Sequence, residues 1–305
     1  MSKETEKVFK ELQKYISDKE FESEEELNVL LDQFISQRNS SVLMKEVTDK
    51  NAETADDYLE LAETASSKRQ ALKFAKKAFE LDPENIDAET AVAELTAKTS
   101  EDLIEKYKNI LDKATERMTV QGYFDEENIG EFWLITETRP YMRLLEKYAD
   151  ILIRCGRIHS AITVCQEMLR LCENDNLGAR YTLMHLYAYL EDEPSALELL
   201  KKYPNEKSSQ ILLPVSMLYY KLGDLKTATK YLKKLNAVNE DTYHFFDGIV
   251  NGKMEEYLAE MDPYSYRPFT IEELLVEAEE NSFLMVSSSA YFEWGLRKLK
   301  GIKKK

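Results

Sequence analysis

Apolar residues recur at helical spacing along almost the whole chain, in short segments separated by tight connections. The first segment lies within residues 3–17, and its apolar positions are Val8, Phe9, Leu12, Tyr15 and Ile16. A second segment begins after Ser23 and Glu26, which form a capping box of the kind that starts a helix. The pattern therefore predicts a helical hairpin in residues 1–45.

A small residue recurs in the second helix of three successive helix pairs. Ala161, Ala196 and Ala228 are 35 and 32 residues apart, close to the roughly 34-residue period of tetratricopeptide repeats. A larger side chain there would force the axes of the two helices apart. Only 9 glycines and 7 prolines are present, whereas a β-rich fold needs turn residues more often. We predict an all-α fold, an α-solenoid of tetratricopeptide-like helix pairs with helical caps at both ends.

Individual residues carry the resemblance to tetratricopeptide repeats. Residues 139–176 match the repeat at its characteristic positions, which are Leu145, Tyr148, Ala149, Leu152, Gly156, Ala161, Cys165 and Met168. Residues 55–85 resemble an atypical, shorter repeat that closes with Leu81, Asp82 and Pro83.

The phrase ETRPYMR (Glu137–Arg143) narrows this resemblance. It is similar to a phrase in a bacterial group of tetratricopeptide proteins without assigned activity, and a eukaryotic family linked to tumour suppression carries a similar one. The likeness covers residues 128–200 best. It implies fold and repeat identity, and it implies no catalytic residue.

The pattern divides the chain into five segments. Residues 1–45 form the N-terminal helical hairpin and residues 46–121 form atypical helical repeats. Residues 122–138 are a connection and a candidate boundary between two sub-arrays. Residues 139–240 hold three tetratricopeptide-like repeats, and residues 241–305 form a C-terminal helical cap with a basic tail.

Charge and apolar content narrow the classes of partner. The chain has 41 basic and 57 acidic residues, a formal net charge of −16. Neutralisation of phosphates supplies most of the affinity of nucleic-acid binders, so this sign argues against a nucleic-acid partner. The longest apolar region, Ile211–Tyr220, is too short to cross a bilayer, and no membrane partner is expected. Three cysteines, an odd number, argue against a disulfide framework and fit a reducing cytoplasm.

No pattern of residues points to catalysis, a cofactor or a metal. His159, His185 and His244 form neither HExxH nor a Cys/His cluster with zinc spacing, and we interpret them as surface or hydrogen-bonded side chains. The sequence has no glycine-rich phosphate loop and no Gly-x-Ser-x-Gly elbow. We therefore expect no enzymatic activity and no bound cofactor.

The resemblance also predicts where a partner binds, because the first helix of each tetratricopeptide pair lines the inner groove. The groove residues projected in this way are Arg143, Asp150 and Arg154 in the first repeat, Leu183, Leu186 and Tyr189 in the second, and Met217, Tyr220 and Lys221 in the third. The second repeat is apolar where a clamp for a C-terminal carboxylate needs polar side chains. The groove therefore fits an amphipathic helix or an extended apolar segment of a protein. The alternative occupant is the chain's own segment Phe283–Leu299.

These observations favour a cytoplasmic adaptor that holds a peptide or helix of a partner protein in a concave groove. A second hypothesis is a peptide or small-molecule sensor of bacterial signalling. An enzyme is the remote third hypothesis.

Overall fold

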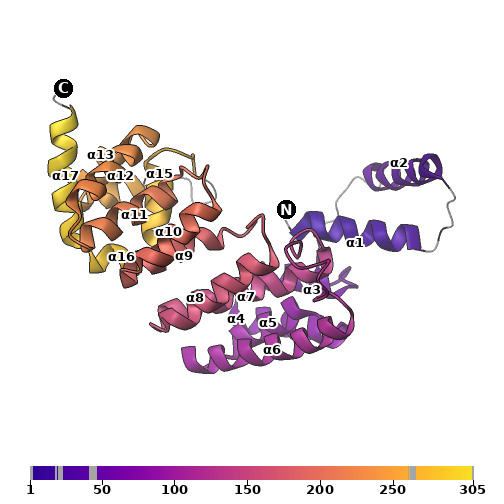
Figure 1. Cartoon of the computed structure of the whole chain (residues 1–305). Helices are drawn as coiled ribbons and strands as arrows, with labels where there is room; N and C mark the ends of the chain where they lie inside the picture. The colour runs from indigo at the N-terminus through magenta and orange to yellow at the C-terminus, as the bar shows by residue number, and fades with distance from the viewer. Residues whose placement is uncertain are drawn as a thin grey trace. The chain divides into compact units, whose positions relative to one another are not determined.

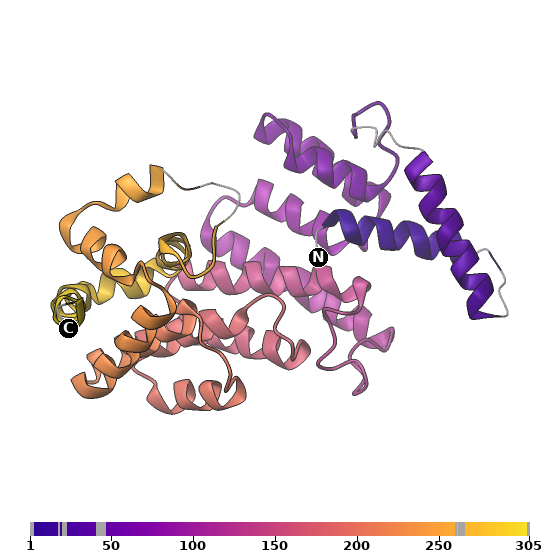
Figure 2. The same cartoon turned by 90° about the horizontal axis from the view of Figure 1, so that it is seen from above.

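The computed structural model describes residues 3–17, 19, 23–40, 47–259, 261 and 266–303. Within these residues every named element is a helix, and the only β-type pairings are isolated bridges from Gly130 and Glu131 to Cys172 (Figures 1 and 2). The prediction of an all-α fold built from successive helix pairs is confirmed.

Two compact units make up the chain. Unit 1 consists of residues 1–157 and 170–174, and unit 2 of residues 158–169 and 175–305. The helices of unit 1 are α1 (Lys3–Ser17), α2 (Glu24–Ser40), α3 (Ala55–Glu63), α4 (Lys68–Leu81), α5 (Ile86–Thr96), α6 (Ser100–Val120), the 3-10 helix η1 (Thr136–Thr138) and α7 (Arg139–Arg154). The division into five sequence segments stays a prediction.

Local capping fixes where the helices of unit 1 begin and end. Ser23 Oγ accepts a hydrogen bond from the Glu26 backbone N–H at 3.2 Å, at the predicted start of α2. Thr54 and Asp57 form a reciprocal capping box at the start of α3. Helix α4 ends at Leu81, directly before the Asp-Pro pair, because proline cannot continue a helix.

Helix α4 packs against α3 and α5, and α6 packs against α5 and α7. Ala75 and Ala78 of α4 are completely buried, so their small side chains let the neighbouring helices approach closely. The buried face of α6 contains Ile104, Tyr107, Ile110, Leu111, Ala114 and Met118.

The segment 122–138 belongs to the body of unit 1. Phe132 is completely buried, and its ring lies 5.0 Å from that of Phe124 and 6.3 Å from that of Tyr141. Its backbone N–H donates to the carbonyl of Leu171 at 3.0 Å. The aromatic side chains of this segment therefore fill part of the core of unit 1 beside α7.

Unit 2 continues the helix-pair pattern. Its helices are α8 (Ile158–Leu171, of which residues 158–169 belong to this unit), α9 (Ala179–Leu190), α10 (Glu193–Lys202), α11 (Ser209–Lys221), α12 (Leu225–Val238), α13 (Thr242–Asn251), α14 (Met254–Ala259), α15 (Ile271–Glu280), α16 (Ser282–Ser287) and α17 (Ser289–Lys303). Helices α9 and α10 pack together, as do α11 and α12, and α9 also packs on α11. Ala161, Ala196 and Ala228 are buried, as the crossing of paired helices requires.

The predicted C-terminal cap is helical and is part of the core of unit 2. Helix α17 packs on α12 and α13, α15 on α11 and α13, and α16 on α9. Phe245 and Phe246 of α13 meet Tyr291 and Phe292 of α17 in one cluster of aromatic rings. In the basic tail, Lys304 and Lys305 lie outside the described residues.

Candidate partner-binding surface

Two arginines of α7 hold one carboxylate of α1. Arg139 and Arg143 are four residues apart, which places them on the same face of the helix. Nη1 of Arg143 lies 2.8 and 2.9 Å from the two carboxylate oxygens of Glu6, and Nη1 of Arg139 lies 3.7 Å from Glu6 Oε1. The side chains of Arg143, Arg139 and Glu6 are 14%, 4% and 6% exposed respectively. The arrangement is a nearly buried receptor for a carboxylate, which we call the two-arginine site.

Other contacts fix both guanidinium groups in place. Arg143 also binds Asp87 of α5, with Nη2–Oδ2 2.5 Å and Nε–Oδ1 3.2 Å. Burial by itself lowers the pKa of Arg143, but Asp87 and Glu6 outweigh that effect and raise it. Arg139 Nε donates to the Trp133 carbonyl at 2.7 Å, and its guanidinium lies 5.6 Å from the Trp133 ring. The site is therefore pre-organised.

The neighbouring residue of α1 contacts a different helix. Lys7 Nζ lies 2.6 Å from Asp57 Oδ1 and 3.5 Å from Glu60 Oε2, both on α3. Burial raises the pKa of Asp57, but hydrogen bonds from Lys7 and from the backbone of Glu53 and Thr54 outweigh it and lower the pKa to about 2. Glu6 and Lys7 thus bind α1 to two first helices of the helix pairs.

The ETRPYMR phrase supplies much of this site. Besides the two arginines, Thr138 Oγ1 donates to the Phe132 and Ile135 carbonyls, and the Tyr141 hydroxyl is hydrogen-bonded to Thr115 at 2.9 Å. The sequence prediction included Arg143 and missed Arg139 and Glu6. The spacing of four could have indicated the arginine pair, but no local pattern points to Glu6, which lies 137 residues away from Arg143.

The face of α7 continues beyond Arg143 with residues that solvent reaches. Lys147 binds Glu94 of α5 at 2.6 Å, and Asp150 forms an ion pair with Arg154 at 2.7 Å. The side chains of Asp150 and Arg154 are more than half exposed. The three groove residues predicted in the first repeat therefore lie on one face of α7, and Arg143 is already bound within the chain.

The residues predicted in the second and third repeats are buried or partly buried within unit 2. Leu183, Leu186 and Met217 are at most 1% exposed. The ring of Tyr189 lies 5.5 Å from that of Phe283, and the ring of Tyr220 lies 5.5 Å from Tyr291 and 5.2 Å from Trp294. Lys221 Nζ donates to the Ala188 carbonyl at 2.9 Å. Aromatic side chains of the segment Phe283–Leu299 thus pack on Tyr189 and Tyr220.

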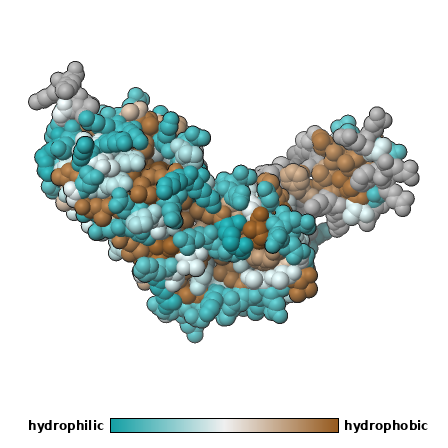
Figure 3. Space-filling view, viewed as in Figure 1, coloured by the Kyte–Doolittle hydropathy of each residue, from teal (hydrophilic) through white to brown (hydrophobic). Residues whose placement is uncertain are grey.

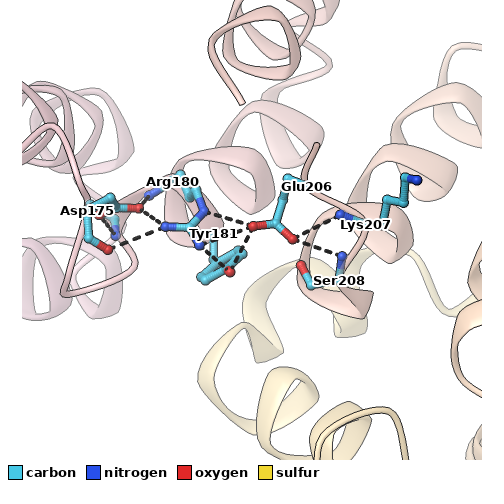
Figure 4. A network of polar contacts seen from close by, with 7 residues as sticks. Asp175, Arg180, Tyr181, Glu206, Lys207 and Ser208 are labelled. Atoms are coloured by element: carbon cyan, nitrogen blue, oxygen red, sulfur yellow. Dashed lines mark hydrogen bonds and ion pairs between the residues drawn. The ribbon is translucent and has the colours of Figure 1, made fainter. Parts of the chain in front are cut away.

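A second polar cluster in unit 2 is satisfied internally (Figure 4). Arg180, in the first turn of α9, binds Asp175 at 2.8 Å and Glu206 at 3.1 Å. The Tyr181 hydroxyl donates to Glu206 at 3.1 Å, and the backbone N–H of Ser208 donates to the same carboxylate at 2.9 Å. These contacts join the start of α9 to the loop before α11, so we assign the cluster a structural role.

Comparisons with known proteins identify no family for the chain. No family model matches it, and no curated protein matches it. Solved structures similar to it include a crystal structure described as "YrrB: a TPR protein with an unusual peptide-binding site". The identity is 20% and the TM-score is 0.40, over 63% of this chain and 90% of the other.

The described residues contain neither a candidate metal site nor a candidate membrane span. No group of three or more His, Cys, Asp or Glu side chains there could hold a metal ion. Among the same residues, no helix has the length and apolar character needed to cross a membrane.

Proposed function

We propose that this protein is a non-enzymatic scaffold that binds a helical segment of a partner protein across the first helices of unit 1. The observation that carries the proposal is the two-arginine site, where the chain already holds one helix, α1, through Glu6. A surface that accepts a helix from its own chain offers the same contacts to a helix from another chain. Asp150 and Arg154 extend this surface along α7.

Helices of the chain itself cover one surface in each unit, α1 in unit 1 and α17 in unit 2. The free energy needed to remove each covering helix favours unit 1 as the binding site. Removing α17 from unit 2 would expose the buried side chains of Tyr291, Phe292, Trp294, Leu296 and Leu299. At about 2 kcal/mol each this costs about 10 kcal/mol, comparable with the stability of a whole domain, which is about 5–15 kcal/mol. Helix α1 is bound to the repeat helices through ion pairs of Glu6 and Lys7. A partner helix with matching charges would replace these ion pairs, so exchanging α1 for it is the smaller change.

Quantitative affinity purification with the full-length chain tests the proposal. Lys147→Glu reverses one exposed charge on the proposed surface, and Lys108→Glu is the matched control on α6, where Lys108 is also exposed. We expect proteins captured by the wild type to be depleted with Lys147→Glu and retained with Lys108→Glu. An identical captured set for both variants would contradict the proposed location.

A further inference from the structure

We infer that the two-arginine site selects partner helices that carry a glutamate followed directly by a lysine. In the absence of a partner α1 occupies the site, and such a helix displaces it. This inference rests on the proposed function and specifies the chemistry of the partner. It adds a recognition rule, namely that the partner helix must carry a Glu-Lys pair. This rule can be wrong even if the protein does bind partner helices.

The requirement for a glutamate follows from the burial of the two arginines. Arg139 and Arg143 are nearly buried, and both approach the carboxylate of Glu6. Asp87 stays beside Arg143 when Glu6 leaves, but both guanidinium groups lose the carboxylate that they approach together, and removing a partner from a nearly buried ion pair is destabilising. A helix that displaces α1 must therefore bring its own carboxylate to the same place. A helix with glutamine or an apolar residue at that position cannot compete.

The requirement for a lysine directly after the glutamate follows from helix geometry. Adjacent residues of a helix point about 100° apart, so Glu6 reaches α7 while Lys7 reaches Asp57 and Glu60 on α3. The two arginines that bind Glu6 thus lie on α7, and the two carboxylates that bind Lys7 lie on α3. A Glu-Lys dipeptide satisfies both only in one direction and one register, so the two contacts together define how the incoming helix lies.

Helix α1 keeps apolar surface uncovered while it occupies the site. Phe9, three residues after Glu6, is 42% exposed. The paired helix α2 leaves Val29 and Ile35 more than half exposed, and Figure 3 shows hydrophobic surface on this hairpin. A partner helix that carries the same charge pair and buries more apolar area has the advantage. The α1 of a second copy would offer the same contacts as the resident helix while losing freedom on association.

Fluorescence anisotropy with a labelled synthetic peptide of residues 1–20 tests the rule against three full-length proteins. In the wild type the tethered α1 competes at high effective concentration, so the peptide binds weakly. In full-length Glu6→Gln the tethered helix loses its carboxylate, and we expect the peptide to bind at least tenfold more tightly. Full-length Glu116→Gln, which changes an exposed glutamate of α6, should behave as the wild type does. For a peptide carrying Glu6→Gln or Lys7→Gln, we expect no such increase in affinity for full-length Glu6→Gln.

Two results would overturn the inference. One is equal affinity of the unmodified peptide and the Glu6→Gln peptide for full-length Glu6→Gln, with circular dichroism showing that the protein is folded. The other is a concentration-dependent dimer of the wild type, detected by light scattering and absent in Glu6→Gln, because the occupant would then be a second copy. If either occurs while captured proteins still depend on Lys147, the scaffold function stands and only the recognition rule fails.

Discussion

The Nε2 atom of His185 in α9 lies 3.1 Å from Oε1 of Glu277 in α15, and both side chains are completely buried. The other ring nitrogen, Nδ1, lies 2.8 Å from the carbonyl oxygen of Tyr181. A carbonyl only accepts hydrogen bonds, so Nδ1 carries a proton. Burial raises the pKa of Glu277, and His185 opposes the shift. The pair connects α9, the first helix of the second predicted repeat, to α15 of the C-terminal cap.

Replacing Glu277 by glutamine should preserve or raise the stability of unit 2 at neutral pH. The amide can donate to Nε2 of His185 and carries no charge that burial penalises. Glu277→Ala should instead cost about 2–4 kcal/mol, because it leaves a cavity and an unpaired imidazole. Urea unfolding followed by the fluorescence of Trp294, in a Trp133→Phe background, reports on this unit.

The pH dependence provides the control for this prediction. A carboxyl group whose pKa is higher in the folded state stabilises the fold below its unfolded pKa, and this contribution is lost as the pH rises through the folded value. The stability of the wild type relative to Glu277→Gln should therefore fall as the pH rises above the ordinary glutamate value of 4.5. A difference that stays constant between about pH 4 and 8 would contradict the raised pKa.

Acid should weaken the contact between α1 and α3. The pKa of Asp57 is lowered from 3.8 to about 2, so its contribution is present above about pH 4 and is lost as the pH falls towards 2. Because the Lys7–Asp57 pair is partly exposed and water screens it, this shift corresponds to about 1 kcal/mol. We expect the stability difference between wild type and Asp57→Asn, measured by the fluorescence of Trp133 in a Trp294→Phe background, to shrink across that window. A difference that persists at about pH 2 would refute the assignment.

Two glycines of α17 should respond oppositely to alanine. A Cβ at Gly295 would overlap the ring of Phe246, whereas a Cβ at Gly301 meets nothing within 4 Å. We expect Gly295→Ala to destabilise unit 2 by about 1–3 kcal/mol through overpacking. Gly301→Ala should stabilise it by up to about 1 kcal/mol, because alanine favours helix more than glycine does. Thermal unfolding of both variants checks the sign of each effect.

A charge at Met217 should unfold unit 2 rather than act on a binding groove. Met217 is completely buried, and an unpaired buried carboxylate costs several kcal/mol. Leu225→Asp is the matched control, because Leu225 is 44% exposed at the first position of α12, where negative charge suits the helix dipole. Urea unfolding followed by circular dichroism should show a loss of more than about 4 kcal/mol for Met217→Asp and about 0.5 kcal/mol or less for Leu225→Asp. Equal stabilities would contradict the observed burial.

The helices and their pairing could be predicted from the sequence because the signals are local. Ala161, Ala196 and Ala228 mark the crossings of paired helices, and the Leu81-Asp-Pro closure marks the end of α4. The accessibility of the predicted groove to a partner could not be predicted from such local signals. Leu183 and Met217 have the same helical spacing whether a partner or the chain's own C-terminal segment covers them, because periodicity identifies an apolar face and not its occupant.

The sequence by itself determined an all-α chain of helix pairs, since helical periodicity, capping and small crossing residues act over a few turns. The tertiary structure decided what lies on the first helices: Glu6 between Arg139 and Arg143 in unit 1, and Phe283, Tyr291 and Trp294 over the predicted groove in unit 2. These contacts join residues far apart in the chain. Their strength depends on how far the fold removes each charge or ring from water, and no local pattern records that.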